Sequence, residues 1–370
     1  MKNKRLTTTI GFWSFIFVIA IGFSYLNNYV WASTGQKLIF TGGSVISYFL
    51  FLAGFYLMKH YKENQSKDLA FQKSWKYTLN RFYKLYPTLF GGVLCAFIVR
   101  NFINKTSLLN IFSVFINSIW EFLGLSQIGI VNALEVKTLT FNPVAGVSYI
   151  WNAPLWVVSA IIISTLILYY VVSKSEDFFA GIFAPVFLIL TYTSIGFAGK
   201  LDSNLLNSFG ILNGLARVIA AMIIGMYLYY IVEYFKKKKF SENIKLLLSF
   251  LHVILGVFIL WNIYNGINWS EVTNSLFILL FLAILLIDKD YISVLYNKSP
   301  LCLFLGKLSY YYYAYFIVFV FMLAYIFPEM SYGASLIFNL LFSICWAYIM
   351  FALDDSVITP IFRKKRLNKN

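Results

Sequence analysis

The chain has 370 residues, of which 60% are hydrophobic and only 12% are charged. Soluble domains are about half apolar and about a quarter charged, so this composition excludes an ordinary soluble protein. The 30 Lys and Arg exceed the 15 Asp and Glu, which gives a net charge of +15. In a soluble protein that excess would indicate nucleic-acid binding. Here the cations lie between long apolar runs, so they indicate membrane orientation and no nucleic-acid partner.

In chain order, the apolar runs predict ten helices, each long enough to cross a bilayer. They are Thr8–Trp31, Leu38–Met58, Phe82–Arg100, Tyr149–Val172, Phe178–Phe197, Ile211–Tyr234, Ile244–Tyr264, Trp269–Ile287, Leu301–Phe327 and Tyr332–Leu353. No repeat of 20–50 residues divides the chain. We therefore predict an all-α integral membrane protein with a single polytopic domain over residues 1–370.

Ser107–Leu125 is an ambiguous eleventh segment. Its polar residues recur at spacings of three and four, which predicts one polar stripe on a helix. These residues are Asn110, Ser113, Asn117 and Glu121. The segment either spans the membrane with the stripe facing the bundle or lies along the interface.

The distribution of charge decides between these topologies. Ten spans with both termini cytoplasmic place 23 of the 30 Lys and Arg inside, as the positive-inside rule favours. An eleventh span would move the Lys236–Lys239 run and the basic tail outside. We therefore predict ten spans, an external and partly membrane-embedded segment over 103–149, and a basic cytoplasmic tail over 361–370.

Cysteine and histidine exclude further kinds of site. Cys95, Cys302 and Cys345 lie in apolar stretches without CxxC or Cys/His spacing, so we expect neither a disulfide framework nor a metal site. His60 is expected at the surface of an inner loop. His252 lies inside a predicted span, where a hydrogen bond to another helix is the expected role.

A few polar residues are candidates for chemistry. Arg81 and Lys84 lie one helical turn apart at the predicted inner surface. Such a pair can bind phosphates of a cofactor or of membrane lipids. Arg217 lies inside a span, where an ionisable group marks a site or pathway unless it snorkels to the surface. Ser24 and Tyr25, near the outer end of the first span, can face an external substrate or bond between helices.

Four short segments follow one another in a fixed order. They are Ser47–Phe55 (SYFLFLAGF), Asn80–Pro87 (NRFYKLYP), Asn152–Trp156 (NAPLW) and Leu305–Tyr310 (LGKLSY). Together they resemble the motifs of the membrane acyltransferase-3 family across most of the chain. The resemblance implies a bacterial plasma-membrane protein of about ten spans. It further implies transfer of an acyl group, acetyl in many members, from cytoplasmic acyl-CoA to a cell-surface polysaccharide or its lipid-linked precursor.

The resemblance also assigns roles and shows departures. It implies that Arg81 and Lys84 bind the donor phosphates. We further expect Ser24, Tyr25 and Arg217 to line the acyl-transfer or glycan path, with Ser24 or Tyr25 as nucleophile or proton donor only if a base lies nearby. The histidine that usually ends the family's first helix falls near Gly22 or Phe23, and a later histidine is Phe316.

Acyl transfer needs a base or an acyl carrier, and the sequence identifies no base. Three functions therefore stay open. The chain is an acyltransferase with rebuilt chemistry, a non-catalytic polysaccharide export or assembly factor that shares the fold, or a secondary transporter.

Overall fold

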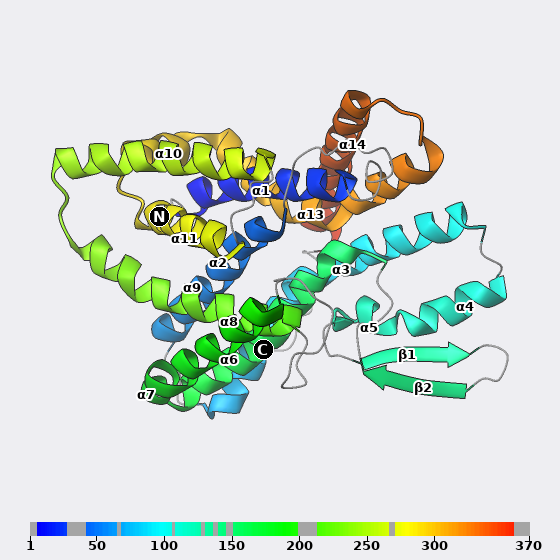
Figure 1. Cartoon of the computed structure of the whole chain (residues 1–370), viewed down its shortest axis with the longest axis horizontal. Helices are drawn as coiled ribbons and strands as arrows, with labels where there is room; N and C mark the ends of the chain where they lie inside the picture. Colours follow the sequence, from blue (N-terminus) through cyan, green and yellow to red (C-terminus); the bar gives the residue numbers. More distant parts are fainter. Residues whose placement is uncertain are drawn as a thin grey trace.

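The computed structural model describes residues 6–27, 42–64, 68–105, 108–126, 130–135, 140–145, 151–198, 213–265 and 271–358. A helix occupies each of the ten predicted apolar runs within these ranges (Figure 1). They are α1 (Leu6–Leu26), α2 (Gly42–Glu63), α3 (Ala70–Ile103), α6 (Trp156–Lys174), α8 (Ala184–Ala198), α9 (Asn213–Lys237), α10 (Glu242–Asn265), α11 (Glu271–Ile287), α13 (Pro300–Ile326) and α14 (Tyr332–Leu353). The predicted cytoplasmic start and the tail over 361–370 lie outside the described residues.

Several of these helices continue into short elements. The 3-10 turn η4 (Ala153–Leu155) precedes α6, and a short helix and a π-helical turn precede α8. These are α7 (Glu176–Phe178) and η5 (Phe179–Phe183). Helix α12 (Tyr291–Lys298) precedes α13, and the π-helical turn η6 (Asp354–Ile358) follows α14.

Eight of the described helices are long and apolar enough to cross a membrane, so the chain is a multi-pass membrane protein. Of the other two, α11 has only 17 described residues, and α2 carries His60 and Lys62 in its last turn. The count of ten spans therefore stays a prediction.

Where the structure describes it, over residues 108–126, the ambiguous segment does not form an eleventh spanning helix. It begins with α4 (Leu108–Asn117) and α5 (Ile119–Phe122), of ten and four residues. These cover about 15 Å and 6 Å, too little for a bilayer core of about 30 Å. Two antiparallel strands follow, β1 (Ile130–Glu135) and β2 (Thr140–Ala145), and they lie beside α4 (Figure 1). This hairpin is an exception to the all-α prediction.

Glycines set the closest helix crossings in the bundle. The most extensive helix contacts join α1 to α13 and α2 to α9. A Cβ on Gly11 of α1 would lie 2.8 Å from the Cα of Gly306 in α13. A Cβ on Gly54 of α2 would lie 1.9 Å from the carbonyl oxygen of Met222 in α9. Glycine at these points lets two helix backbones touch, as is common in membrane bundles.

Polar contacts bring the basic connecting segments to one end of the bundle. Lys62 at the end of α2 pairs with Glu176 at 2.5 Å, and Tyr230 of α9 donates to the same carboxylate at 2.5 Å. Lys289, between α11 and α12, donates to the carbonyl of Lys236 at 2.7 Å. These are segments that the charge distribution predicts to be cytoplasmic, and we refer to this end as the inner end.

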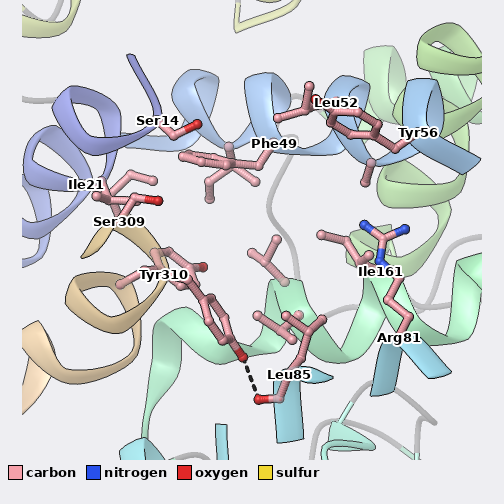
Figure 2. Close-up of a pocket in the computed structure, with 16 residues that line it drawn as sticks. Ser14, Ile21, Phe49, Leu52, Tyr56, Arg81, Leu85, Ile161, Ser309 and Tyr310 are labelled. Atoms are coloured by element: carbon pink, nitrogen blue, oxygen red, sulfur yellow. Dashed lines mark hydrogen bonds between the residues drawn. The ribbon is translucent and has the colours of Figure 1, made fainter. Parts of the chain in front are cut away.

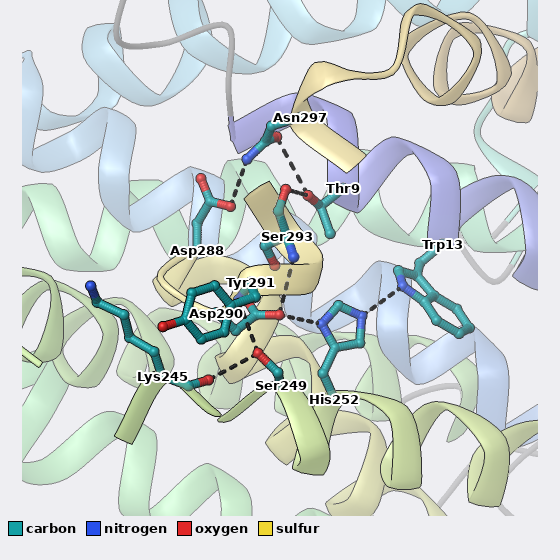
Figure 3. Close-up of polar contacts among 10 residues, drawn as sticks. All are labelled: Thr9, Trp13, Lys245, Ser249, His252, Asp288, Asp290, Tyr291, Ser293 and Asn297. Carbon is teal, nitrogen blue, oxygen red and sulfur yellow. Dashed lines mark hydrogen bonds and ion pairs between the residues drawn. The ribbon is translucent and has the colours of Figure 1, made fainter. Parts of the chain in front are cut away.

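His252 joins three helices near the inner end (Figure 3). The indole Nε1 of Trp13 donates to His252 Nε2 at 3.2 Å, so the ring proton lies on Nδ1 and is donated to Asp290 at 2.9 Å. The predicted hydrogen bond between helices is therefore confirmed. Burial opposes ionisation of Asp290, but the hydrogen bonds from His252 and Ser293 hold its pKa below the ordinary value.

Candidate functional site: a basic vestibule joined to an apolar cavity

A cavity of about 240 Å³ lies within the helix bundle. Side chains of α1, α2, α3, α6 and α13 line it, and most of them are hydrocarbon. We call it the apolar cavity, lined by Ser14, Val18, Ile21, Ile46, Phe49, Leu52, Ala53, Tyr56, Arg81, Leu85, Val157, Val158, Ile161, Ser309, Tyr310 and Tyr313. In Figure 2, Arg81 and Tyr56 lie at one end of the cavity, while Ile21 and Ser309 lie at the other.

The apolar cavity extends far into the membrane domain. Ile46 and Tyr56 of α2 both line it, and ten helical residues correspond to about 15 Å. Tyr56 is near the inner end of α2, whereas Ile46 is one turn after its outer start. A flexible group that enters beside Tyr56 can therefore reach the outer half of the bundle.

Several hydroxyl groups in the cavity wall donate to backbone carbonyls. Ser14 donates to Ile10 at 2.8 Å, and Ser309 donates to Gly306 at 2.8 Å. Tyr310 donates to the carbonyl of Leu85 at 2.9 Å (Figure 2). Because these donors are engaged, the cavity offers a mainly apolar surface, suited to a hydrocarbon-rich arm rather than to a charged group.

A second, polar cavity of about 580 Å³ lies at the inner end. It is formed where α2 ends, α3 begins and α6 approaches its last turns. We call it the basic vestibule, lined by Tyr56, His60, Asn64, Asp68, Lys73, Lys76, Tyr77, Asn80, Arg81, Lys84 and Tyr169. Four cations and one carboxylate give it a net charge of +3. Tyr56 and Arg81 line both cavities, so the two spaces adjoin.

Arg81 is the charged residue at the junction of the two cavities. Its Nη1 atom is buried and has no hydrogen-bond partner among the residues that the structure describes. A guanidinium is always charged, and a buried donor without a partner is costly. An anionic group bound at this junction, such as a phosphate, would supply the missing acceptor and a counter-charge.

The structure brings together two of the predicted site residues. Arg81 and Lys84 both line the basic vestibule, as their spacing on one helical face predicts. Ser24 is buried near the outer end of α1, and the ring of Tyr25 lies 5.7 Å from that of Phe316. Neither residue lines the apolar cavity or the basic vestibule.

Arg217 also lies outside both cavities. Its side chain is only 2% exposed, and Nη2 donates to the carbonyl of Gly43 at 2.7 Å and to Ser47 Oγ at 3.5 Å. This arginine therefore joins α9 to the outer start of α2. The catalytic roles of Ser24, Tyr25 and Arg217 stay predictions.

The vestibule corrects the interpretation of the inner loop. Helix α2 continues to Glu63 and α3 begins at Ala70, so His60 is helical rather than on a loop. His60 is half-buried, with Nδ1 3.1 Å from the Tyr169 hydroxyl. The many charged residues between residues 59 and 84 favoured the prediction of a loop. The spacing of Lys73, Lys76, Tyr77, Asn80, Arg81 and Lys84 is the signal that predicts one helical face.

Comparison with family models, with curated proteins and with solved structures finds no match to this chain.

Proposed function

We propose that this chain is an acyltransferase-3-like protein of the bacterial plasma membrane. It transfers an acyl group from cytoplasmic acyl-CoA to a surface polysaccharide or its lipid-linked precursor. The acyl group that we propose is acetyl. The observation that carries the proposal is Arg81, which lines both the basic vestibule and the apolar cavity. A donor with phosphates at one end and a flexible, uncharged arm at the other matches that pair of spaces.

The four motif segments give further support, because they converge on one site. Ser47–Phe55 and Asn80–Pro87 contribute lining residues, as does Leu305–Tyr310. Asn152–Trp156 ends directly before Val157, which lines the cavity too. Segments far apart in the chain thus surround one cavity, as expected if they share a ligand.

In the proposed reaction, a hydroxyl oxygen of the glycan bonds to the thioester carbonyl carbon. The carbon–sulfur bond breaks, and the hydroxyl proton leaves with the CoA thiol. Arg81 and Lys84 hold the donor phosphates at the inner end. The apolar cavity orients the arm toward the outer half of the membrane, where Ser24, Tyr25 and Arg217 form the proposed path to the acceptor.

A second candidate function is a non-catalytic role in polysaccharide export or assembly. One contact favours it. A Cβ on Gly22 would lie 3.5 Å from Phe316, so two positions where the resemblance implies histidines are neighbours and carry glycine and phenylalanine. Phe316 is completely buried. Neither residue can transfer a proton, so this variant of the fold can bind a ligand without reacting.

Deletion of the gene, followed by analysis of the surface glycan, separates the two functions. If the chain is the enzyme, O-acyl groups are lost while the polymer remains, and Arg81→Ala fails to restore them. Lys298→Ala removes an exposed cation outside the vestibule and serves as the matched control. Loss of the polymer itself would support export instead. Unchanged acylation and unchanged polymer would contradict both functions.

A further inference from the structure

The basic vestibule has a wall formed by one continuous face of α3. Lys73, Lys76, Tyr77, Asn80, Arg81 and Lys84 all line it. Their spacing of three and four residues places them in one stripe along the helix. From Lys73 to Lys84 the stripe covers about 16 Å. A ligand bound along this wall is therefore extended and can carry more than one anionic group.

The cations of this stripe differ from their neighbours on the inner end. Lys59, Lys62, Lys236 and Lys245 each pair with a glutamate. Among the described residues, no carboxylate pairs with Lys73, Lys76 or Lys84. Positive charge is therefore concentrated in the vestibule, whereas glutamates neutralise the cations of the neighbouring surface. This difference favours a polyanionic ligand in the vestibule.

Three aromatic rings form a second wall. The centroids of His60 and Tyr77 are 4.2 Å apart, and those of Tyr77 and Tyr169 are 4.7 Å apart. Tyr169 is buried and holds His60 by a hydrogen bond of 3.1 Å, while His60 and Tyr77 are half-exposed. Rigid aromatic rings beside phosphate-binding cations are the combination that binds nucleotides, because every base can stack on a ring.

We propose that the basic vestibule is a nucleotide-binding site in which a purine stacks on the His60–Tyr77–Tyr169 cluster. The α3 cations bind the attached phosphates, and Arg81 holds the last phosphate before the arm enters the apolar cavity. This inference rests on the proposed function and deepens it. The donor is recognised by its nucleotide end, so a thioester on a bare phosphopantetheine arm is a poor substrate.

The first test uses the unmodified full-length protein in nanodiscs of neutral lipid. Labelled CoA is displaced with adenosine 3′,5′-bisphosphate, 4′-phosphopantetheine or inorganic phosphate. We expect the bisphosphate to displace CoA. We expect phosphopantetheine, which lacks the adenosine and two of the three phosphates of CoA, to bind at least about tenfold more weakly than CoA. Equal binding of CoA and phosphopantetheine, or displacement of CoA by phosphate as readily as by the bisphosphate, would overturn the nucleotide site.

The second test changes the aromatic wall. Tyr77→Leu should weaken CoA binding about tenfold and leave phosphopantetheine binding unchanged, while Tyr77→Phe retains the stack and the affinity. Tyr83→Leu is the matched control, because Tyr83 is 55% exposed on α3 and does not line the vestibule. Equal CoA affinity in Tyr77→Leu and Tyr83→Leu would refute the stacking site.

The same titrations keep the two proposals distinguishable. Binding of the bisphosphate without binding of acetyl-CoA would support the nucleotide site and contradict the acyl donor. Binding of acetyl-CoA that is insensitive to Tyr77→Leu would leave the donor intact and contradict the nucleotide site. If neither molecule binds, both proposals are wrong.

Discussion

Arg81 differs from the other cations of the inner end because its side chain contributes to both cavities. It lines the polar vestibule and the apolar cavity, and within the described part of the chain its buried Nη1 has no hydrogen-bond partner. A lysine at this position would present a point charge without the planar donor fork that fits phosphate. The chain retains a guanidinium at the place where a phosphate would end and an apolar arm would begin.

The cavity beside Arg81 can be filled without touching the vestibule. Val158→Phe adds a ring from α6 into the apolar cavity, at a residue that is only 6% exposed. Overpacking a tight core usually costs about 1–3 kcal/mol. Here the cavity has room, so we expect a nearly unchanged melting temperature but acetyl-CoA affinity lower by at least about tenfold. Val186→Phe, at a half-exposed site on α8, is the control. Unchanged acetyl-CoA affinity in Val158→Phe would exclude the cavity as the acyl site.

Spacing predicted some site residues and not others. Arg81 and Lys84 were identifiable because two cations one turn apart share a helical face. The contact of His60 with Tyr169 was not, because the two residues are 109 positions apart and only the packing of α2 on α6 joins them. Arg217 was expected on a substrate path. That role stays a prediction. The structure shows its guanidinium bonded to the start of α2, a partner that spacing cannot identify.

At the scale of elements, Glu121 attaches the external segment to the start of α6. Its two carboxylate oxygens accept the backbone N–H groups of Trp151 and Asn152 at 2.7 and 2.8 Å. Asn152 in turn donates to the carbonyl of Ala314 in α13 at 2.8 Å. Burial raises the pKa of Glu121 to about 7, although these hydrogen bonds oppose the shift. The carboxyl group therefore titrates near neutral pH.

The raised pKa predicts a pH-dependent stability. Relative to an ordinary value of 4.5, the folded protein favours protonated Glu121, so its contribution is full below about pH 4.5 and is lost as pH rises through about 7. Glu121→Gln cannot ionise, and it leaves one N–H without an acceptor, at a cost of about 1–3 kcal/mol. We expect the variant to melt below the wild type at about pH 5.5 and the gap to narrow by about pH 8. A gap that does not change with pH would contradict this role, and Glu329→Gln, at an exposed site, is the control.

The helices themselves were largely predictable, whereas the start of α3 and one hairpin were not. Apolar runs located all ten long helices, because a bilayer demands about twenty apolar residues. The early start of α3 at Ala70 was missed, since its first turns are charged and extend beyond the apolar run. The hairpin of β1 and β2 follows from local pairing outside the bundle, where hydropathy carries no signal.

At the scale of the molecule, the basic segments define one end of the bundle and the vestibule opens there. Contacts of Glu176 and Lys289 join the ends of α2, α9 and α11 at that end. The positive-inside rule predicts that this end faces the cytoplasm, where the proposed acyl-CoA donor would be available. The apolar cavity then leads from that face toward the outer half of the membrane. The predicted membrane orientation therefore agrees with the proposed acyl-CoA ligand.

Binding of labelled acetyl-CoA to sealed membrane vesicles of known orientation tests this account most directly. We expect saturable binding to inside-out vesicles, little binding to right-side-out vesicles, and a loss of at least about tenfold in affinity with Arg81→Ala but not with Lys298→Ala. Binding confined to right-side-out vesicles, or binding that Arg81→Ala leaves unchanged, would contradict the claim that a cytoplasmic acyl donor enters through the vestibule.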